Sequence, residues 1–305
     1  MKFLLPKEEI TSEKLTRLVT DSFEKNGYVT FLCDETLLSG FFDEFIDGLT
    51  DYELEPIAIA ASKKNSRPAL FFIKIKVKVD LEYSLDFIIQ TLLMNLDQNE
   101  DGYFIHGFGK VDDLKKTIQI FKKLVIAKDT KNKFIFRWYD PRVLVYLPVI
   151  IDKKSERIES FLEDWHFVFF NGLYEVKTQE RRALFPLTFT NAESAKLDLI
   201  ELSNIVIKQS LIYDEQLSIR QDEILESLHQ ATTQYRILHV TDLIAYGMYS
   251  VILHKDFMRS SRVSSIISHY WVERLEANSF TTAMDYLEEN QYSQVKQECE
   301  EGYHG

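Results

Sequence analysis

Short apolar runs alternate with amphipathic stretches in the first part of the chain. Val29–Cys33 and Tyr103–His106 are runs of β-forming residues bounded by polar or glycine residues, which predict strands. Residues 37–49 and 111–124 carry apolar side chains at helical spacing, which predicts a helix after each of those strands. An alternation of strands and helices joined by short loops is typical of an α/β lobe. We therefore expect a mostly parallel sheet with right-handed crossovers, flanked by helices.

One segment of this lobe alternates apolar and cationic residues with a period of two, which predicts a half-exposed strand. Two interpretations of its lysines are open. They can keep an edge strand from pairing with other chains, or they can form a positive stripe that binds an acidic partner. The segment is Ile73, Lys74, Ile75, Lys76, Val77, Lys78 and Val79.

The composition changes after Pro186. All six prolines lie at or before that residue, and only three of the ten glycines follow it. Thr190–Glu193 has the pattern of a capping box, and it opens a series of segments with helical periodicity. These features predict an α/β lobe over residues 1–187, an all-α lobe over 188–292 and a flexible acidic tail over 293–305.

A strand-like aromatic run that begins at Phe134 is followed by signals for the start of a helix. Asp140 is a favoured N-cap and Pro141 a favoured first helical residue, so a buried strand is expected to turn into a helix there. Ligands often bind at the carboxyl ends of strands in α/β sheets, which makes Arg137, Asp140 and Arg142 candidates for catalysis or ligand binding. The alternative is that Asp140 caps the helix and pairs with one arginine, which is the commoner role.

Composition narrows the possible partners. A formal net charge of −12 argues against nonspecific binding to nucleic acid or anionic lipid. The apolar start of the chain ends at once after Pro6, and no stretch of about 18 uncharged apolar residues occurs, so we expect a cytoplasmic protein without membrane insertion. Cys33 and Cys299 are the only cysteines, and neither has a second thiol or a histidine near it in sequence, so no disulfide or metal site is predicted.

Motifs for catalysis are missing from the sequence. It contains no nucleophile elbow, zinc-binding helix or Walker loop. We therefore expect neither enzymatic activity nor a cofactor. The rival hypothesis is an enzyme that acts on a small anionic substrate at strand ends near His106, Arg137 and Asp140.

The run from Arg137 to Leu144 resembles the motif of the type VI secretion effector chaperones, also called adaptors. The resemblance extends more loosely from about Tyr28 to Tyr174. It implies a cytoplasmic adaptor that binds a cognate effector toxin and promotes its loading onto the valine-glycine-repeat (VgrG) spike protein, without catalysis or a cofactor. It also implies that the motif residues chiefly maintain the lobe. They are Arg137, Trp138, Tyr139, Asp140, Pro141, Arg142, Val143 and Leu144.

Two groups of side chains are candidates for contact with the effector. One is the face formed by Lys74, Lys76 and Lys78, and the other is a set of aromatic residues in the helical lobe. The alternatives are solvated lysines and ordinary core packing. A further possibility is a structural subunit of the secretion machine, which predicts a complex of fixed stoichiometry. The aromatic candidates are Tyr246, Tyr249 and Trp271.

Overall fold

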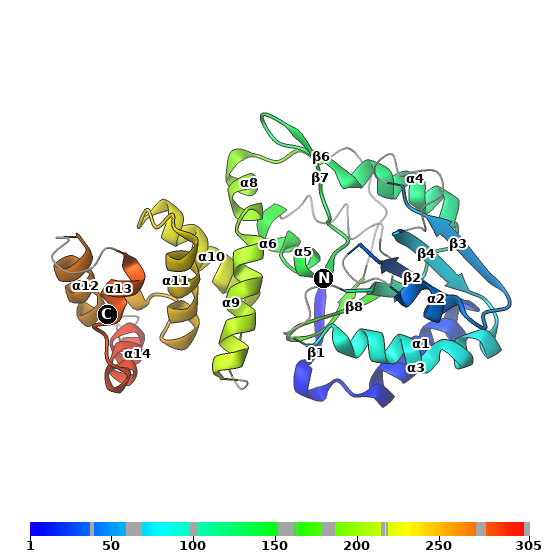
Figure 1. Ribbon diagram of the computed structural model, residues 1–305, viewed down its shortest axis with the longest axis horizontal. Coiled ribbons are helices and arrows are strands. Elements are labelled where there is room, and N and C mark those ends of the chain that lie inside the picture. Colours follow the sequence, from blue (N-terminus) through cyan, green and yellow to red (C-terminus); the bar gives the residue numbers. More distant parts are fainter. Residues whose placement is uncertain are drawn as a thin grey trace. The chain divides into compact units, whose positions relative to one another are not determined.

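The chain divides into two compact units, Met1–Glu193 and Ser194–Gly305, whose elements are labelled in Figure 1. The expected boundary near residue 187 lies shortly before this division. The computed structural model describes residues 1–36, 40–58, 69–97, 103–151, 162, 164–177, 187–214, 217, 219–272 and 279–301.

A seven-stranded sheet forms the centre of the first unit. Its strand order is β1-β9-β8-β5-β2-β4-β3, and every pair of neighbours is antiparallel. The second strand of the chain therefore lies near the middle of the sheet, between two strands that follow it in sequence. The strands are β1 (Lys2–Pro6), β2 (Val29–Asp34), β3 (Tyr52–Pro56), β4 (Leu70–Ile75), β5 (Ile105–Gly109), β8 (Trp165–Phe169) and β9 (Gly172–Val176).

The prediction of a mostly parallel sheet is wrong. β4 and β5 are joined through a helix and do run in the same direction, but β2 lies between them and pairs antiparallel with both. All residues of β2, β4 and β5 are buried, because helices cover both faces of the sheet. Continuous apolar strands are typical of parallel sheets, whereas antiparallel sheets often expose one face. Because helices cover both faces of this antiparallel sheet, its central strands are buried along their whole length and mostly apolar, as the strands of a parallel sheet usually are.

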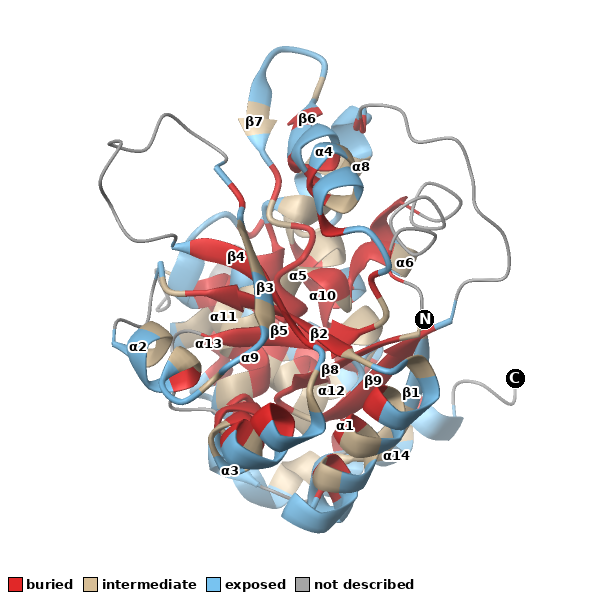
Figure 2. Ribbon diagram, turned by 90° about the vertical axis from the view of Figure 1, so that its right-hand side faces the viewer, coloured by how far each residue is buried: buried red, intermediate tan, exposed pale blue. Residues whose placement is uncertain are grey.

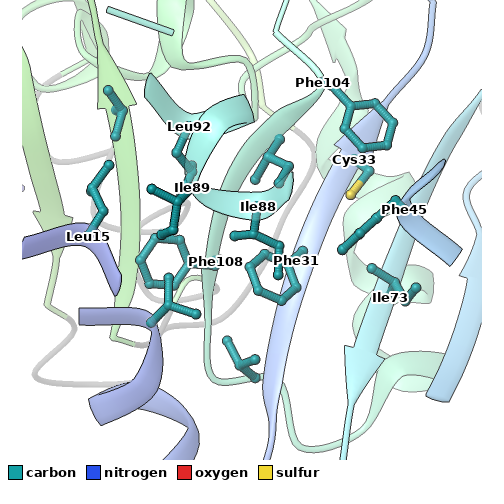
Figure 3. Packing of buried hydrophobic residues seen from close by; sticks show 14 of the residues in the cluster. Leu15, Phe31, Cys33, Phe45, Ile73, Ile88, Ile89, Leu92, Phe104 and Phe108 are labelled. Carbon is teal, nitrogen blue, oxygen red and sulfur yellow. The ribbon is translucent and has the colours of Figure 1, made fainter. Parts of the chain in front are cut away.

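Three helices pack on one face of the sheet. Side chains of β2 that point to this face, such as Phe31, meet Leu15 of α1, Phe45 of α2 and Ile88 of α3 in one apolar cluster (Figure 3). Figure 2 shows β2, β4 and β5 as buried, whereas the helices carry exposed surface. The three helices are α1 (Ser12–Asn26), α2 (Phe41–Ile46) and α3 (Lys78–Met94).

The opposite face carries α4 and the chain that follows it. Phe121 of α4 packs edge to face on Phe72 of β4, with ring centroids 5.8 Å apart. After α4 the chain forms a hairpin and then two short helices. The other elements among the described residues of this unit are η1 (Lys7–Glu9), α4 (Leu114–Val125), β6 (Ile126–Lys128), β7 (Lys133–Ile135), α5 (Pro141–Leu144), α6 (Leu147–Ile151) and α8 (Asn191–Leu197), which crosses the division between the units.

Every element described after Ser194 is helical. The core of this second unit gathers aromatic rings from three elements, with Tyr246 packed on Phe257 and Phe280 at centroid distances of 5.0 and 5.6 Å. The elements are α9 (Ile200–Tyr213), α10 (Gln221–Thr233), α11 (Val240–Ile252), η3 (Phe257–Arg259), α12 (Ser261–Ile266), η4 (Ile267–Val272), α13 (Phe280–Met284), η5 (Glu289–Gln291) and α14 (Tyr292–Glu301).

The end of the chain differs from the expected flexible tail. Most of residues 293–305 belong to α14, which buries Val295 and Cys299. The Glu298 carboxylate accepts hydrogen bonds from the Ser260 and Ser261 hydroxyls at 2.7 and 3.0 Å, so this helix is tied to the start of α12. Among the described residues, no helix has the length and apolar character that a bilayer span requires.

Gly107 is predicted to fix the spacing between β5 and β8. Its φ is +154°, and an added Cβ would lie 2.3 Å from Trp165 Nε1 and 2.7 Å from the His166 carbonyl oxygen. We expect Gly107→Ala to lower the free energy of unfolding by about 3 kcal/mol, through backbone strain and the forced separation of the strands. Urea denaturation followed by circular dichroism measures the loss.

Gly27→Ala is the matched control, because Gly27 also has a positive φ of +75° but an added Cβ there meets nothing within 4 Å. It should cost about 1 kcal/mol, from backbone strain alone. Equal losses for the two variants would show that close approach at Gly107 does not limit the sheet.

Candidate functional site

The junction before α5 begins with a hairpin strand and ends with a helix cap. The strand, β7, covers only Lys133–Ile135 and pairs with β6 in a two-stranded sheet, so the expected buried strand of the main sheet is wrong. The helix start is confirmed: Pro141 is the first helical residue, and the Asp140 side chain accepts a hydrogen bond from the Arg142 backbone N–H at 3.0 Å. The strand–helix junction is therefore held by Asp140.

Two arginines and two aspartates form ion pairs around this cap. Arg142 binds Asp140 through two hydrogen bonds, Nε to Oδ1 at 3.0 Å and Nη2 to Oδ2 at 2.7 Å. Arg137 Nη2 lies 2.9 Å from Oδ2 of Asp34 at the end of β2, and 3.5 Å from Oδ2 of Asp140. Arg137 thereby joins the central strand of the sheet to the start of α5.

His106 of β5 completes this group, which we call the junction network: Asp34, His106, Arg137, Asp140 and Arg142. The imidazole is buried, and its Nε2 lies 3.7 Å from Asp34 Oδ2, which is beyond hydrogen-bond distance. Neither ring nitrogen has a hydrogen-bond partner among the described residues. The ring packs beside Tyr139, with centroids 5.5 Å apart.

The electrostatics of the network favour an ionised Asp140 and a neutral His106. Burial by itself raises the pKa of Asp140, but the hydrogen bond from Arg142 and the nearby positive charges hold that pKa at about 2. Burial lowers the pKa of His106, against the attraction of Asp140 and Asp34 for its charged form. Two aspartates and two arginines then balance to zero charge at neutral pH.

The other residues of the motif contribute to packing. Trp138 and Tyr139 are both buried against Phe121 of α4, with ring centroids 5.0 and 5.1 Å from it. Pro141 and Leu144 are buried in α5, and Val143 is half-buried. The stretch from Arg137 to Leu144 thus joins the sheet, α4 and α5.

This arrangement leaves little scope for catalysis. The Asp34 and Asp140 side chains are 2% and 5% exposed, and each carboxylate is bonded to a guanidinium. A general base must reach its substrate, directly or through one water. Among the described residues, no group of three or more histidine, cysteine, aspartate or glutamate side chains could hold a metal ion. Both carboxylates of the junction network are thus shielded from solvent and paired with guanidinium groups.

The predicted lysine face does not form, because the alternating segment is not one strand. β4 ends at Ile75 and α3 begins at Lys78, so Val79 lies in the first turn of a helix with its side chain exposed. The β-branched valines extended the apparent period of two beyond the true end of the strand. The three lysines consequently lie in a strand, a connection and a helix.

Each of these lysines also has its own partners within the first unit. Lys74 is buried, donates to the Asp112 carbonyl oxygen at 2.8 Å and lies 4.4 Å from the Tyr28 ring centroid. Lys76 lies 2.9 Å from Glu53, and Lys78 lies 3.7 Å from Glu24.

The aromatic candidates of the helical unit differ in how much of them is described. Tyr246 is buried in the aromatic core. Tyr249 is half-buried and packs on Phe257, with ring centroids 6.0 Å apart. Trp271 belongs to η4, but its side chain lies outside the described part of the chain.

Asp34 is the residue of the junction network that was not identified from the sequence. It precedes Arg137 by 103 positions, so no local pattern connects them. The available signal is that Asp34 ends an apolar run, Val29–Cys33, and the end of a buried strand is an expensive place for an unpaired carboxylate.

Asp140→Ala should lower the free energy of unfolding by about 3 kcal/mol, because it removes a cap and leaves the half-buried Arg142 guanidinium without its counter-charge, while Arg137 keeps Asp34. The pKa of Asp140 is about 2 in the folded chain, below its unfolded value, so its stabilising effect is full above about pH 4. The effect is lost as the pH falls through 2. Urea denaturation at pH 7 and pH 2.5 should therefore show a smaller difference between wild type and variant at the lower pH.

Asp113→Ala is the control for the loss of a cap alone, because Asp113 caps α4 through a hydrogen bond from the Lys116 N–H at 3.0 Å and is exposed. It should cost about 1 kcal/mol. If Asp140→Ala lowered the free energy of unfolding by no more than Asp113→Ala does, the ion pairs of Asp140 would not contribute the proposed stability.

Because burial lowers the pKa of His106, the unfolded chain binds a proton there more tightly than the folded chain does. Stability should fall as the pH drops through about 6.5 toward 5, and His106→Gln should make that fall less steep. The buried His166 has a lowered pKa as well, so the slopes of wild type and variant are compared with each other. An NMR titration midpoint for His106 at or above 6.5 would contradict this prediction.

The roles given to Asp34, His106 and Asp140 come from distances, burial and charge within this chain. No family model, curated protein or solved structure matches it. The adaptor hypothesis consequently depends on the motif from Arg137 to Leu144 and on the behaviour of its residues.

Proposed function

We propose that this chain is a cytoplasmic adaptor that binds a type VI secretion effector and promotes its loading onto the VgrG spike, without catalysing a reaction. The observation that carries this proposal is that side chains of the motif from Arg137 to Leu144 form ion pairs, cap a helix and pack in the core. Residues used in this way act through the shape of the lobe. That matches the role which the resemblance implies for them.

The charge of the chain supports a protein partner. A net charge of −12 disfavours binding to nucleic acid and to anionic membranes, because both are polyanions. An adaptor also needs no cofactor and no reactive group. The paired carboxylates of Asp34 and Asp140 suit that requirement.

One observation favours the rival hypothesis of an enzyme for a small anionic substrate. His106 is buried without a hydrogen-bond partner for either ring nitrogen, and it lies in the same network as Arg137, whose side chain is 34% exposed. A buried unpartnered imidazole costs free energy, and such groups occur at functional sites. The test must therefore separate loss of fold from loss of chemistry.

The test is affinity purification of the tagged chain from its native host, followed by mass spectrometry and by an assay for effector release. We expect one large toxin-like protein to co-purify, with or without VgrG, and deletion of the adaptor to abolish secretion of that toxin. A complex of fixed stoichiometry with baseplate components would indicate a structural subunit instead. A folded chain that recovers no protein would contradict the adaptor proposal.

A pair of variants tests how the motif acts. Asp140→Ala removes the cap and ion pair, and Leu92→Ala removes a buried side chain of α3 at a comparable cost in stability. If the motif acts through the lobe, recovery of the toxin should fall in proportion to the loss of stability in both variants. If the Asp140→Ala variant stayed folded and lost toxin recovery while Leu92→Ala kept it, a reactive site at Asp140 would be favoured.

A further inference from the structure

Residues 114–135 form a strongly basic segment in an acidic chain. They contain seven lysines, one aspartate and no arginine, for a net charge of +6, which leaves −18 on the rest of the chain. All seven lysines are exposed, and no carboxylate lies within salt-bridge distance of any of them among the described residues. The lysines are Lys115, Lys116, Lys122, Lys123, Lys128, Lys131 and Lys133.

The β6–β7 hairpin gives part of this segment a defined surface. Paired residues of an antiparallel ladder lie on the same face, and successive residues alternate between faces. Ala127 pairs with Phe134 on one face, where Phe134 stacks on Phe189 at a centroid distance of 5.8 Å. That face packs against the protein, and the opposite face is exposed.

The exposed side, which we call the hairpin face, consists of Ile126, Lys128, Lys133 and Ile135. Ile126 pairs with Ile135, and Lys128 pairs with Lys133. The two isoleucines are 41% and 52% exposed. Two apolar side chains thus lie beside two ammonium groups on one small surface.

The lysine pair is unfavourable in the isolated chain, because like charges directly opposite each other destabilise an antiparallel ladder. The two isoleucines pair across the strands, but they still keep apolar area in water. The helix dipole accounts for Lys122 and Lys123 in the last turn of α4, but not for Lys128 opposite Lys133. A partner that supplies carboxylates and apolar contact would relieve both costs.

The backbone of the hairpin offers an attachment point. On its other side β6 is bonded to the chain at Leu187 and Phe189, whereas β7 pairs only with β6 among the described residues. Asp129 holds the turn through hydrogen bonds from the Lys131 and Asn132 N–H groups, both at 2.6 Å. Within the part of the chain that the structure describes, the outer edge of β7 is therefore open for an added strand. Figure 2 shows the exposed turn between β6 and β7.

We propose that the hairpin face binds an acidic segment of the protein client, which adds to β7 as a strand with carboxylates on Lys128 and Lys133 and an apolar side chain on the isoleucines. This inference deepens the proposed adaptor function, and it rests on that function for the identity of the client. Lysines on an edge strand can also serve only to prevent pairing. The exposed isoleucines beside them distinguish this edge, because they favour contact.

The observations favour a protein segment over nucleic acid. The negative charge elsewhere on the chain repels a long polyanion, whereas an extended segment of a few residues fits within the basic region. Sites for nucleic acid also use arginine and stacking aromatic rings, and residues 114–135 contain no arginine.

The direct test measures fluorescence anisotropy of a labelled eight-residue peptide of alternating glutamate and valine, with the full chain at 50 mM salt. We expect saturable binding that weakens at least tenfold at 500 mM salt. Lys128→Glu/Lys133→Glu should weaken binding at least tenfold. Lys115→Glu/Lys116→Glu is the matched control, because it changes the charge equally in the first turn of α4, a helix about 18 Å long whose other end leads into the hairpin, and should weaken binding less than threefold.

Stability gives a second readout. A single Lys133→Glu change places opposite charges on the paired strands, so its melting temperature should not fall although its binding does. If the variant instead lost binding because it unfolds, its melting temperature would fall as well.

Three results would overturn the proposal: no binding of the peptide, an equal loss of peptide binding in the two double variants, or binding only to a DNA duplex or to anionic phosphatidylserine vesicles tested in parallel.

Failure of this proposal can be distinguished from failure of the adaptor function. If the wild type recovers its toxin and Lys128→Glu/Lys133→Glu recovers the same amount, the client does not bind at the hairpin face, and the adaptor function is supported. If the wild type recovers no toxin but the peptide binds at the hairpin face, the adaptor function is contradicted, and the hairpin face is supported as a peptide-binding surface.

Discussion

The pairing of two buried carboxylates with arginine side chains determines how the first unit is assembled. Asp34 ends β2 and Asp140 caps α5, and an unpaired charge at either buried position would cost free energy. Arg137 contacts both, and Arg142 completes the pairing at Asp140. The route of the chain from the hairpin to α5 is therefore fixed by charge as much as by apolar packing. This is why a run of eight residues can combine a cap, ion pairs and large aromatic side chains.

The sequence predicts the elements of this unit better than it predicts their connection. Apolar runs located β2 and β5, and Asp140 with Pro141 located the start of α5. The direction of pairing depends on which strand inserts between which others, and that information is not local. β2 enters between β4 and β5, so a strand–helix–strand alternation that normally gives parallel neighbours gives none here.

Most of the candidate site was predictable from the sequence. The cap and the Asp140–Arg142 pair follow from adjacent residues, and His106 was expected near Arg137 and Asp140 at the strand ends, whereas Asp34 joins them through the sheet and has no local signal that connects it to Arg137. The lysine alternation shows the opposite error, because a period of two continued by chance from β4 into the first turn of α3. The basic character of residues 114–135 is visible in the sequence. Its meaning depends on strand register, which places Lys128 opposite Lys133.

The central position of β2 also affects how the chain emerges during synthesis. Its two neighbours in the sheet, β4 and β5, begin at Leu70 and Ile105, so β2 leaves the ribosome long before either is available. Throughout that interval an apolar strand with two unpaired edges must avoid other chains, which is the condition under which aggregation competes with folding. The amphipathic α1 directly precedes β2 and can shelter one of its faces, but its edges stay open until the later strands arrive. The late synthesis of both neighbours of β2 thus extends the period in which the nascent chain is exposed to aggregation.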